Sequence, residues 1–275
     1  MVKSQKKEEN DYFELLLRSA PASWALIRAN EIKAMDSVNF KPPVLDVGCG
    51  DGVVARVVLS KTGGKFDYGI DISPKEIRKA KKSGAYKHCR IASIYKLPFS
   101  NSSFQTVFAN SVIEHFQKLD KSLSEMARVL KPGGRLIMTT PSPFLSKYLL
   151  GYRLFCSLGL IFMANWYASF FHYLVKHYNI YDHKGWKKIL AKQNLKLVDY
   201  YYYHSPVTIQ VHEVFSYLAI PQHIYRLIVG YWPVFPTLRN LFFGWLFRRI
   251  PLDLYNGKVS KTEGGSLLLI AKWVG

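Results

Sequence analysis

Short apolar runs alternate with longer segments that mix apolar and charged residues through the middle of the chain. The short runs predict strands, and the longer segments predict helices. Strands are predicted at 44–47, 67–72, 89–92, 104–109 and 136–140, and helices at 53–59, 75–82 and 119–130. Strands that alternate with helices indicate an α/β fold with a largely parallel sheet.

This alternating region, residues 42–140, is flanked by segments with a different pattern. Residues 1–41 carry apolar side chains at helical spacing, with an interruption at Pro21, and predict an N-terminal helical cap. Residues 141–275 form the C-terminal half of the chain. The organisation predicted is therefore a cap, a core and a C-terminal half.

The C-terminal half contains further elements of the core and two long apolar segments. A helix is predicted at 185–192, and strands at 195–203 and 266–273. The apolar segments, 143–181 and 207–255, lie before and between these elements. They have no counterpart in a simple alternation of strands and helices.

Composition narrows the class of protein. A hydrophobic content of 49% excludes an intrinsically disordered chain. Three cysteines in 275 residues do not make a disulfide framework, and the polar start of the chain has no apolar leader. We therefore expect a cytoplasmic protein in a reducing compartment.

The chain is strongly basic, with 38 Lys and Arg against 19 Asp and Glu, a net charge of +19. The imbalance is greatest in residues 141–275, which hold fifteen basic and five acidic residues. A basic surface attracts nucleic acid, anionic lipid or acidic substrates, and charge alone does not choose among them.

The most specific motif is the segment LDVGCGDG at 45–52, between a predicted strand and a predicted helix. Glycines at alternate positions let the backbone turn sharply and bring main-chain N–H groups to a ligand. Asp71, at the end of the second predicted strand, is placed to accept hydrogen bonds from ribose hydroxyls. The glycine spacing differs from the dinucleotide fingerprint and suits a ligand without a pyrophosphate.

With four further motifs, the chain resembles the class I S-adenosylmethionine-dependent methyltransferases, in the small-molecule group that opens with LDVGCGxG. The motifs are GIDIS at 69–73, LPF at 97–99 followed by Ser103-Phe104, IEH at 113–115 and RVLKPGG at 128–134. The resemblance implies a doubly wound, mostly parallel seven-stranded sheet, with 42–140 as the S-adenosylmethionine-binding core. The apolar segments would then be helical insertions.

The resemblance also implies which residues bind S-adenosylmethionine. They are Asp46, Gly48, Cys49, Gly50, Gly52, Asp71, Ile72, Ser93, Ile94 and Asn110. Asp46 and the glycines would shape the loop under the methionine part of the cofactor, with Cys49 as a small filler.

The remaining roles concern the adenosine. Asp71 would hold the ribose, Ile72 would pack on the adenine, and Ser93 and Ile94 would contact the adenine edge. Asn110 would lie beside the methionine tail. Ser93 departs from the family, which usually has Asp there, and a hydroxyl is a weaker acceptor than a carboxylate.

His115 is the candidate catalytic base. Methyl transfer requires a positioned nucleophile and exclusion of water, and a base only when the nucleophile must lose a proton. An imidazole that titrates near neutral pH suits that role, and the alternative is a histidine that lines the pocket without moving a proton. Glu114 is expected to be structural. The scattered cysteines and histidines predict no metal site.

Residues 154–175 contain no Asp, Glu, Lys or Arg. As one helix they would be roughly 33 Å long, close to the roughly 30 Å of a bilayer core. Three interpretations stay open: a lid or acceptor pocket, contact with the membrane interface, and a membrane span. Residues 224–247, with aromatics before the pair Arg248-Arg249, are typical of an interfacial anchor on anionic lipid.

These observations favour a methyltransferase of a small lipophilic or lipid-linked acceptor, peripherally associated with an anionic membrane surface. One alternative is an RNA methyltransferase that uses the basic surface, although no RNA-binding module is appended. The other is a non-catalytic interaction protein with the same fold. The acceptor, the acceptor atom and the oligomeric state are left open.

Overall fold

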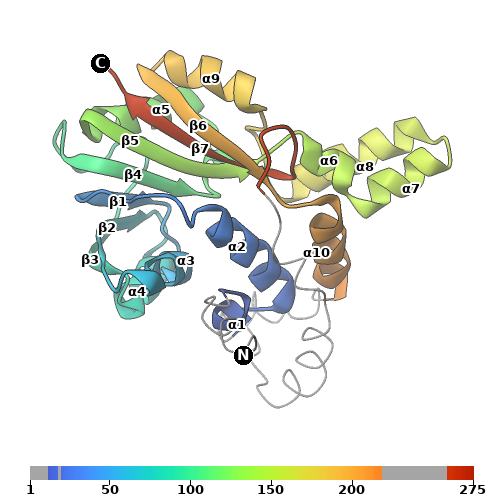
Figure 1. Cartoon of the computed structure of the whole chain (residues 1–275), viewed down its shortest axis with the longest axis horizontal. Helices are drawn as coiled ribbons and strands as arrows, with labels where there is room; N and C mark the ends of the chain where they lie inside the picture. The colour runs from blue at the N-terminus through green and yellow to red at the C-terminus, as the bar shows by residue number, and fades with distance from the viewer. Residues whose placement is uncertain (1–11, 18–19, 219–258) are drawn as a thin grey trace, which may run out of the picture.

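The computed structural model describes residues 12–17, 20–218 and 259–275. Its strands form a single seven-stranded sheet in the order β3-β2-β1-β4-β5-β7-β6 (Figure 1). Neighbouring strands are parallel from β3 to β5, and β7 runs antiparallel to both β5 and β6. The predicted mostly parallel, seven-stranded sheet is therefore confirmed. The strands are β1 (Val44–Val47), β2 (Phe66–Asp71), β3 (Tyr86–Ile91), β4 (Phe104–Asn110), β5 (Leu130–Pro141), β6 (Leu195–Tyr203) and β7 (Ser266–Trp273).

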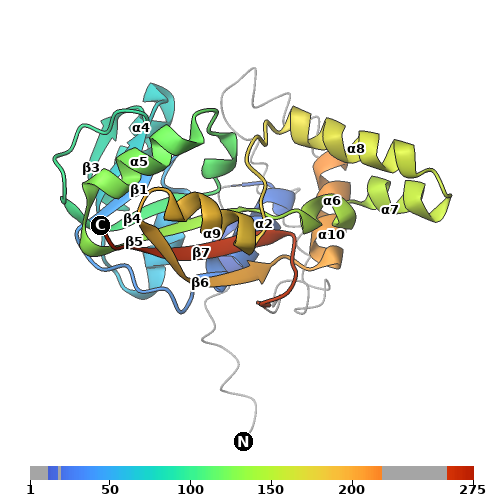
Figure 2. The same cartoon turned by 90° about the horizontal axis from the view of Figure 1, so that it is seen from above.

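Helices cover both faces of this sheet, as Figures 1 and 2 show. One face packs against α1, α2 and α3, and the other against α5 and α9. The α-helices are α1 (Tyr12–Leu17), α2 (Ala22–Ala34), α3 (Val53–Val58), α4 (Pro74–Ser83), α5 (Leu119–Val129), α6 (Phe144–Tyr148), α7 (Leu150–Ser157), α8 (Ile161–Leu174), α9 (His183–Ala191) and α10 (Pro206–Leu218). Two short 3-10 turns are η1 (Leu59–Lys61) and η2 (Ile113–His115).

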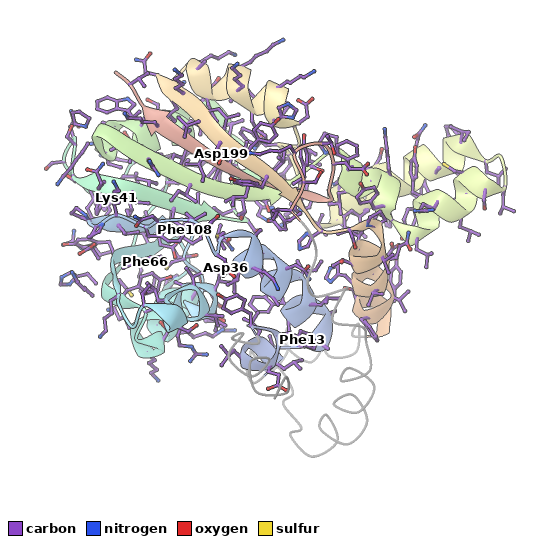
Figure 3. The ribbon with its side chains drawn as sticks, viewed as in Figure 1. Phe13, Asp36, Lys41, Phe66, Phe108 and Asp199 are labelled. Carbon is purple, nitrogen blue, oxygen red and sulfur yellow. The ribbon has the colours of Figure 1, made fainter. Side chains whose placement is uncertain are left out.

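The apolar runs form strands because side chains on both faces of the sheet are buried. In β4, Val107 joins the cluster on the α5 side, whereas Phe108 joins the cluster on the α2 side. Phe66 of β2 points to the same side as Phe108, and the two ring centroids lie 6.0 Å apart (Figure 3). A strand covered on both faces appears in the sequence as a continuous apolar run.

Two strands extend beyond the predicted bounds. β3 begins at Tyr86, before the expected start at 89, because it is an edge strand on which Lys87 and His88 are exposed to solvent. β5 begins at Leu130, before the expected 136, since Leu130 already pairs with Phe104 of β4. The sequence did not predict these extensions, because β3 has polar residues near its start and β5 begins with a glycine-containing segment.

The segment 154–175 is not one continuous helix, because it contains the end of α7 and the whole of α8, joined at 158–160. α7 and α8 form a hairpin that projects away from the sheet (Figures 1 and 2). They approach closely at Gly151, where a Cβ would lie 2.5 Å from Cζ of Tyr167. Within the residues that the structure describes, no helix combines the length and apolar character needed to cross a bilayer. The anchor predicted at 224–247 lies outside the described residues.

Candidate active site

A cavity of about 220 Å³ lies at the carboxyl ends of the first strands of the sheet. In open parallel sheets, ligands bind at this edge. Of the predicted cofactor residues, Gly48, Asp71, Ile72, Ser93 and Ile94 line the cavity. Sequence reasoning missed six other lining residues: Val47, Ile70, Ala92, Tyr95, Val112 and Phe116. Most of these residues directly precede or follow a predicted residue in the chain, and this proximity could have identified them.

The glycine loop is tied to strand β2 by main-chain hydrogen bonds. The N–H groups of Gly48 and Cys49 both donate to the carbonyl of Ile70, at 2.8 and 2.9 Å. Gly48 has φ +70°, and a Cβ there would lie 2.5 Å from Cγ2 of Val112. Gly50 has φ +53°, and a Cβ there would meet no atom within 4 Å. The loop therefore has no room for a side chain at Gly48, whereas the space next to Gly50 is open.

Asp71 joins the loop to the cavity. Its Oδ2 accepts from the N–H of Gly50 at 3.0 Å, and its Oδ1 accepts from the N–H of Ser73 at 2.8 Å. A carboxylate has about four acceptor positions, so capacity for hydroxyl donors remains. Asp71 therefore holds the backbone of the loop and of the turn after β2, and it can still accept hydrogen bonds from a ligand.

The walls of the cavity fit the adenosine part of S-adenosylmethionine. The side chain of Ile72 is 73% exposed beside Asp71, which leaves an apolar surface open to a flat ring. Ile94 and Phe116 supply further apolar walls. Ser93 lines the same cavity, and its hydroxyl oxygen accepts from the N–H of Tyr95 at 3.3 Å. A carboxylate that can accept from ribose hydroxyls, beside apolar walls on which a flat ring can pack, fits a nucleoside.

Five predicted cofactor residues lie outside the lining of this cavity, and one of them is Gly50, whose N–H donates to Asp71. Asp46 is buried under the loop, where the Tyr86 hydroxyl donates to its Oδ2 at 2.6 Å, and burial raises the pKa of Asp46 to about 7. Cys49 is half-buried, and burial raises the pKa of its thiol. Gly52 packs on Tyr86, 2.9 Å from where its Cβ would be. Asn110, the fifth, lies at the end of β4. Their contact with the cofactor stays a prediction.

Asn110 belongs to a buried polar cluster that the sequence did not predict. Its centre is Glu31 of α2, which is 1% exposed. Hydrogen bonds to its carboxylate come from Arg28, Asn110, Ser111, Thr139 and Tyr203, at 2.5 to 3.1 Å. Burial opposes ionisation of Glu31, but the charge of Arg28 and these hydrogen bonds outweigh it and lower the pKa of Glu31 to about 2. The cluster fixes α2 against the ends of β4, β5 and β6.

His115 lies on η2, between Val112 and Phe116, which both line the cavity. Its own side chain is 42% exposed and is not part of the lining in the described structure. Its Nδ1 lies 3.0 Å from the carbonyl of Lys176, and its Nε2 lies 3.9 Å from Oε1 of Glu114. The structure thus places His115 beside the cavity, and its role as a base stays a prediction.

Residues 45–138 match a family described as a methyltransferase domain. This segment is a class I, S-adenosylmethionine-dependent methyltransferase domain. Its match begins at the glycine loop and ends in β5, so it contains the whole lining of the cavity. The cofactor of the methyltransferase domain is S-adenosylmethionine.

Curated relatives of the methyltransferase domain are named for different substrates. A demethylmenaquinone methyltransferase of Chlorobaculum parvum is 30% identical over 118 residues, 43% of this chain and 48% of the relative. A sterol 4-C-methyltransferase of Caenorhabditis elegans is 36% identical over 100 residues, 34% of this chain and 29% of the relative. The chain therefore matches less than half the length of these relatives.

Solved structures extend the likeness to the whole fold. An S-adenosylmethionine-dependent methyltransferase of Thermotoga maritima superposes with a TM-score of 0.55. The superposition covers 96% of this chain and 94% of the other at 14% sequence identity. At this level of identity the likeness establishes the fold of the methyltransferase domain and its surroundings.

Proposed function

We propose that the chain transfers a methyl group from S-adenosylmethionine to a small lipophilic acceptor at a membrane surface. The observation that carries this proposal is the α7–α8 hairpin, which projects away from the sheet and exposes large apolar side chains (Figure 1). The methyltransferase domain supports the reaction, and the hairpin supports the class of acceptor.

The cofactor supplies an electrophilic methyl group on a sulfonium sulfur when it is bound. The chain's own residues have the tasks of binding and of excluding water. Asp71 would accept from the ribose hydroxyls, while Ile72 and Ile94 would pack on the adenine. The Gly48 and Gly50 positions keep side chains out of the space that the rest of the cofactor needs.

The hairpin has an apolar surface that the rest of the described chain does not cover. Its most exposed large side chains are Phe162 at 84%, Tyr173 at 79%, Leu158 at 63% and Leu174 at 60%. Contiguous apolar patches of this kind mark membrane or protein interaction sites. The buried seam of the hairpin is made of small residues such as Ala164, so its large side chains are left to face outward.

The charge around the hairpin fits an anionic lipid surface. Residues 143–181 contain no Asp or Glu, and their charged residues are Lys147, Arg153 and Lys176. Basic residues that flank an apolar surface strengthen its binding to anionic headgroups. The acceptor would then leave the lipid phase at the hairpin.

Contacts connect the hairpin to the edge of the cavity. His172 of α8 lies 3.2 Å from His177, measured between the two Nδ1 atoms, and the rings of His177 and His115 have centroids 5.5 Å apart. His115 in turn lies on η2, between cavity residues. These contacts support a role for the base of the hairpin in holding the acceptor near the cofactor. Relatives named for demethylmenaquinone and sterol methylation support a lipophilic acceptor.

The proposal is tested by incubating the protein with methyl-labelled S-adenosylmethionine and a total cell extract, then separating organic from aqueous phases. We expect label in the organic phase, lost in Asp71→Ala and retained in Asp51→Ala. Asp51 is a matched control, because it caps Val53 N–H two residues on, as Asp71 caps Ser73 N–H. Label confined to the aqueous phase would contradict a lipophilic acceptor, and its loss with ribonuclease would point to RNA.

A further inference from the structure

Three potential metal ligands meet beside the cofactor cavity. Glu114 and His115 come from η2, and His177 comes from the segment that follows α8. One ligand atom from each residue lies within 4.8 Å of the others. His177 directly follows Lys176, which is 61 residues beyond His115 in the chain. The spacing of ligands along the sequence therefore does not reveal this cluster.

The carboxylate of Glu114 is held in the cluster without its full set of partners. Glu114 is 3% exposed, and its Oε2 has no hydrogen-bond partner among the residues that the structure describes. A buried polar atom without a partner costs roughly 1–3 kcal/mol, more for a charged group. The other oxygen, Oε1, faces Nε2 of His115 at 3.9 Å. A cation bound by this carboxylate and the neighbouring imidazole would neutralise the buried group, through Oε1 or through the unpaired Oε2.

Both imidazoles are oriented by contacts of a second ring nitrogen. His115 Nδ1 lies 3.0 Å from the carbonyl of Lys176, which fixes the ring with Nε2 toward Glu114. His177 Nδ1 contacts His172, whose Nε2 lies 2.8 Å from the hydroxyl of Ser146. Histidines that bind metals usually have such outer contacts, which set the tautomer and hold the ring.

The two chain segments are fastened to each other independently of any ligand. The N–H of Tyr178 donates to the carbonyl of Glu114 at 2.7 Å. The buried amide of Asn179 donates to the carbonyls of Ile113 and Phe116, at 3.0 and 2.6 Å. The three side chains are therefore brought together by the fold itself.

We propose that Glu114, His115 and His177 bind a divalent transition-metal ion, with Zn²⁺ as the best match. Two imidazoles and one carboxylate are a donor set that Zn²⁺ prefers. Three protein ligands leave a coordination position open, as in sites where the metal meets a substrate or water. The ion would stand beside η2, whose neighbours along the chain, Val112 and Phe116, line the cavity. In this proposal His115 binds the metal, which is an alternative to the base role predicted from the sequence.

Calorimetric titration of the chelator-treated full chain with Zn²⁺ tests the site without reference to activity. We expect one ion per chain, and at least about tenfold weaker binding in Glu114→Gln and in His177→Ala. His88→Ala is the matched control, since His88 is exposed on β3 away from the cluster, and it should bind as the wild type does.

X-ray absorption at the zinc edge of the wild-type complex gives a second readout that does not depend on folding of the variants. Two imidazoles with oxygen ligands would support the site. Three results would each overturn it: no uptake of Zn²⁺, uptake that the Glu114→Gln and His177→Ala variants leave unchanged, or a zinc-edge spectrum without imidazole.

Discussion

The two ends of the carboxyl edge of the sheet are built differently. On the cofactor side, the Gly48–Gly50 loop, the Asp71–Ile72 pair and the Ser93–Ile94 pair each follow closely on a strand. On the other side, Glu31 of α2 meets Thr139 of β5 and Tyr203 of β6. The first region is assembled from local turns, and the second from contacts between distant segments.

The difference teaches which forces hold each region. The cofactor side depends on backbone conformation, because its loop is closed by main-chain hydrogen bonds and by glycines at positive φ. The other side depends on a buried charge, since the Glu31 carboxylate is 1% exposed and, despite this burial, its pKa is lowered by the charge of Arg28 and by hydrogen bonds. Both regions are sensitive to mutation, but to different substitutions. A side chain added at a glycine harms the first region, and loss of a buried polar partner harms the second.

The largest effect is expected from Glu31→Ala. This variant leaves Arg28 without its buried partner, and breaking such a pair costs about 3–5 kcal/mol of unfolding free energy. The matched control is Glu76→Ala in α4, an i,i+3 pair with Lys79 whose side chain is 23% exposed against 1% for Glu31. The control should cost less than about 1 kcal/mol. Equal losses in urea unfolding would contradict the distinction between the regions.

The pH dependence of stability is the next largest effect. Burial raises the pKa of Asp46 to about 7 and the pKa of Glu114 to about 8. Between the ordinary and the raised value, the folded chain keeps a proton that the unfolded chain has released. Stability is therefore full below the ordinary pKa and falls as pH rises, by at most about 1.4 kcal/mol per pH unit for each group.

Two variants show how much each carboxyl contributes to this decrease of stability with rising pH. In the presence of chelator, Asp46→Asn should remove the part that ends near pH 7, and Glu114→Gln the part that ends near pH 8. Glu31 acts in the opposite direction, because its lowered pKa contributes stability that is lost as pH falls toward 2. Urea unfolding across the pH range measures all three. Identical pH profiles for wild type and variants would show that these carboxyls do not carry the dependence.

Gly48→Ala should be more harmful than Gly50→Ala. Both residues have positive φ, but only a Cβ at Gly48 collides with Val112, at 2.5 Å. Overpacking of this kind costs about 1–3 kcal/mol beyond the strain that both variants share. Thermal unfolding and cofactor affinity measure the difference. If Gly50→Ala is the more destabilised variant, the loop is not held as the structure shows.

The smallest effect concerns the hairpin and leaves folding unchanged. Phe162→Glu should weaken binding to anionic vesicles by at least about tenfold, because burial of a Phe side chain contributes about 1.5–3 kcal/mol. Val198→Glu is the control, since Val198 is 48% exposed on β6, outside the hairpin. Vesicle flotation distinguishes the two. Equal binding of both variants would remove the hairpin from the membrane contact.

The fold and the cofactor side could be predicted from sequence for a physical reason. A strand buried on both faces must be apolar throughout, and a loop that touches a ligand with its backbone must contain glycine. Both requirements act over a few neighbouring residues, so they appear as motifs such as 45–52. Asp71 follows the same logic, because its position at the end of β2 suffices to place it.

The other side could not be predicted, because its partners are far apart in the chain. Nothing near Glu31 indicates that it contacts Thr139, 108 residues away. His177 likewise reaches η2 only through the course of α8 and the hydrogen bonds of Asn179. The turn that divides 154–175 into α7 and α8 had Gly159 as its local signal. The apolar composition of 154–175 is compatible with one helix or with two, so it did not predict the turn.

The most direct test of the cofactor site is the affinity for S-adenosylmethionine of Asp71→Ala beside Asp51→Ala. Both acids accept a backbone N–H two residues on, but only Asp71 lines the cavity. Loss of charge-assisted hydrogen bonds to the ribose predicts at least about tenfold weaker binding for Asp71→Ala. Asp51→Ala should stay within about twofold of the wild type. Equal losses, or an unchanged affinity in Asp71→Ala, would contradict the assignment of this cavity as the cofactor site.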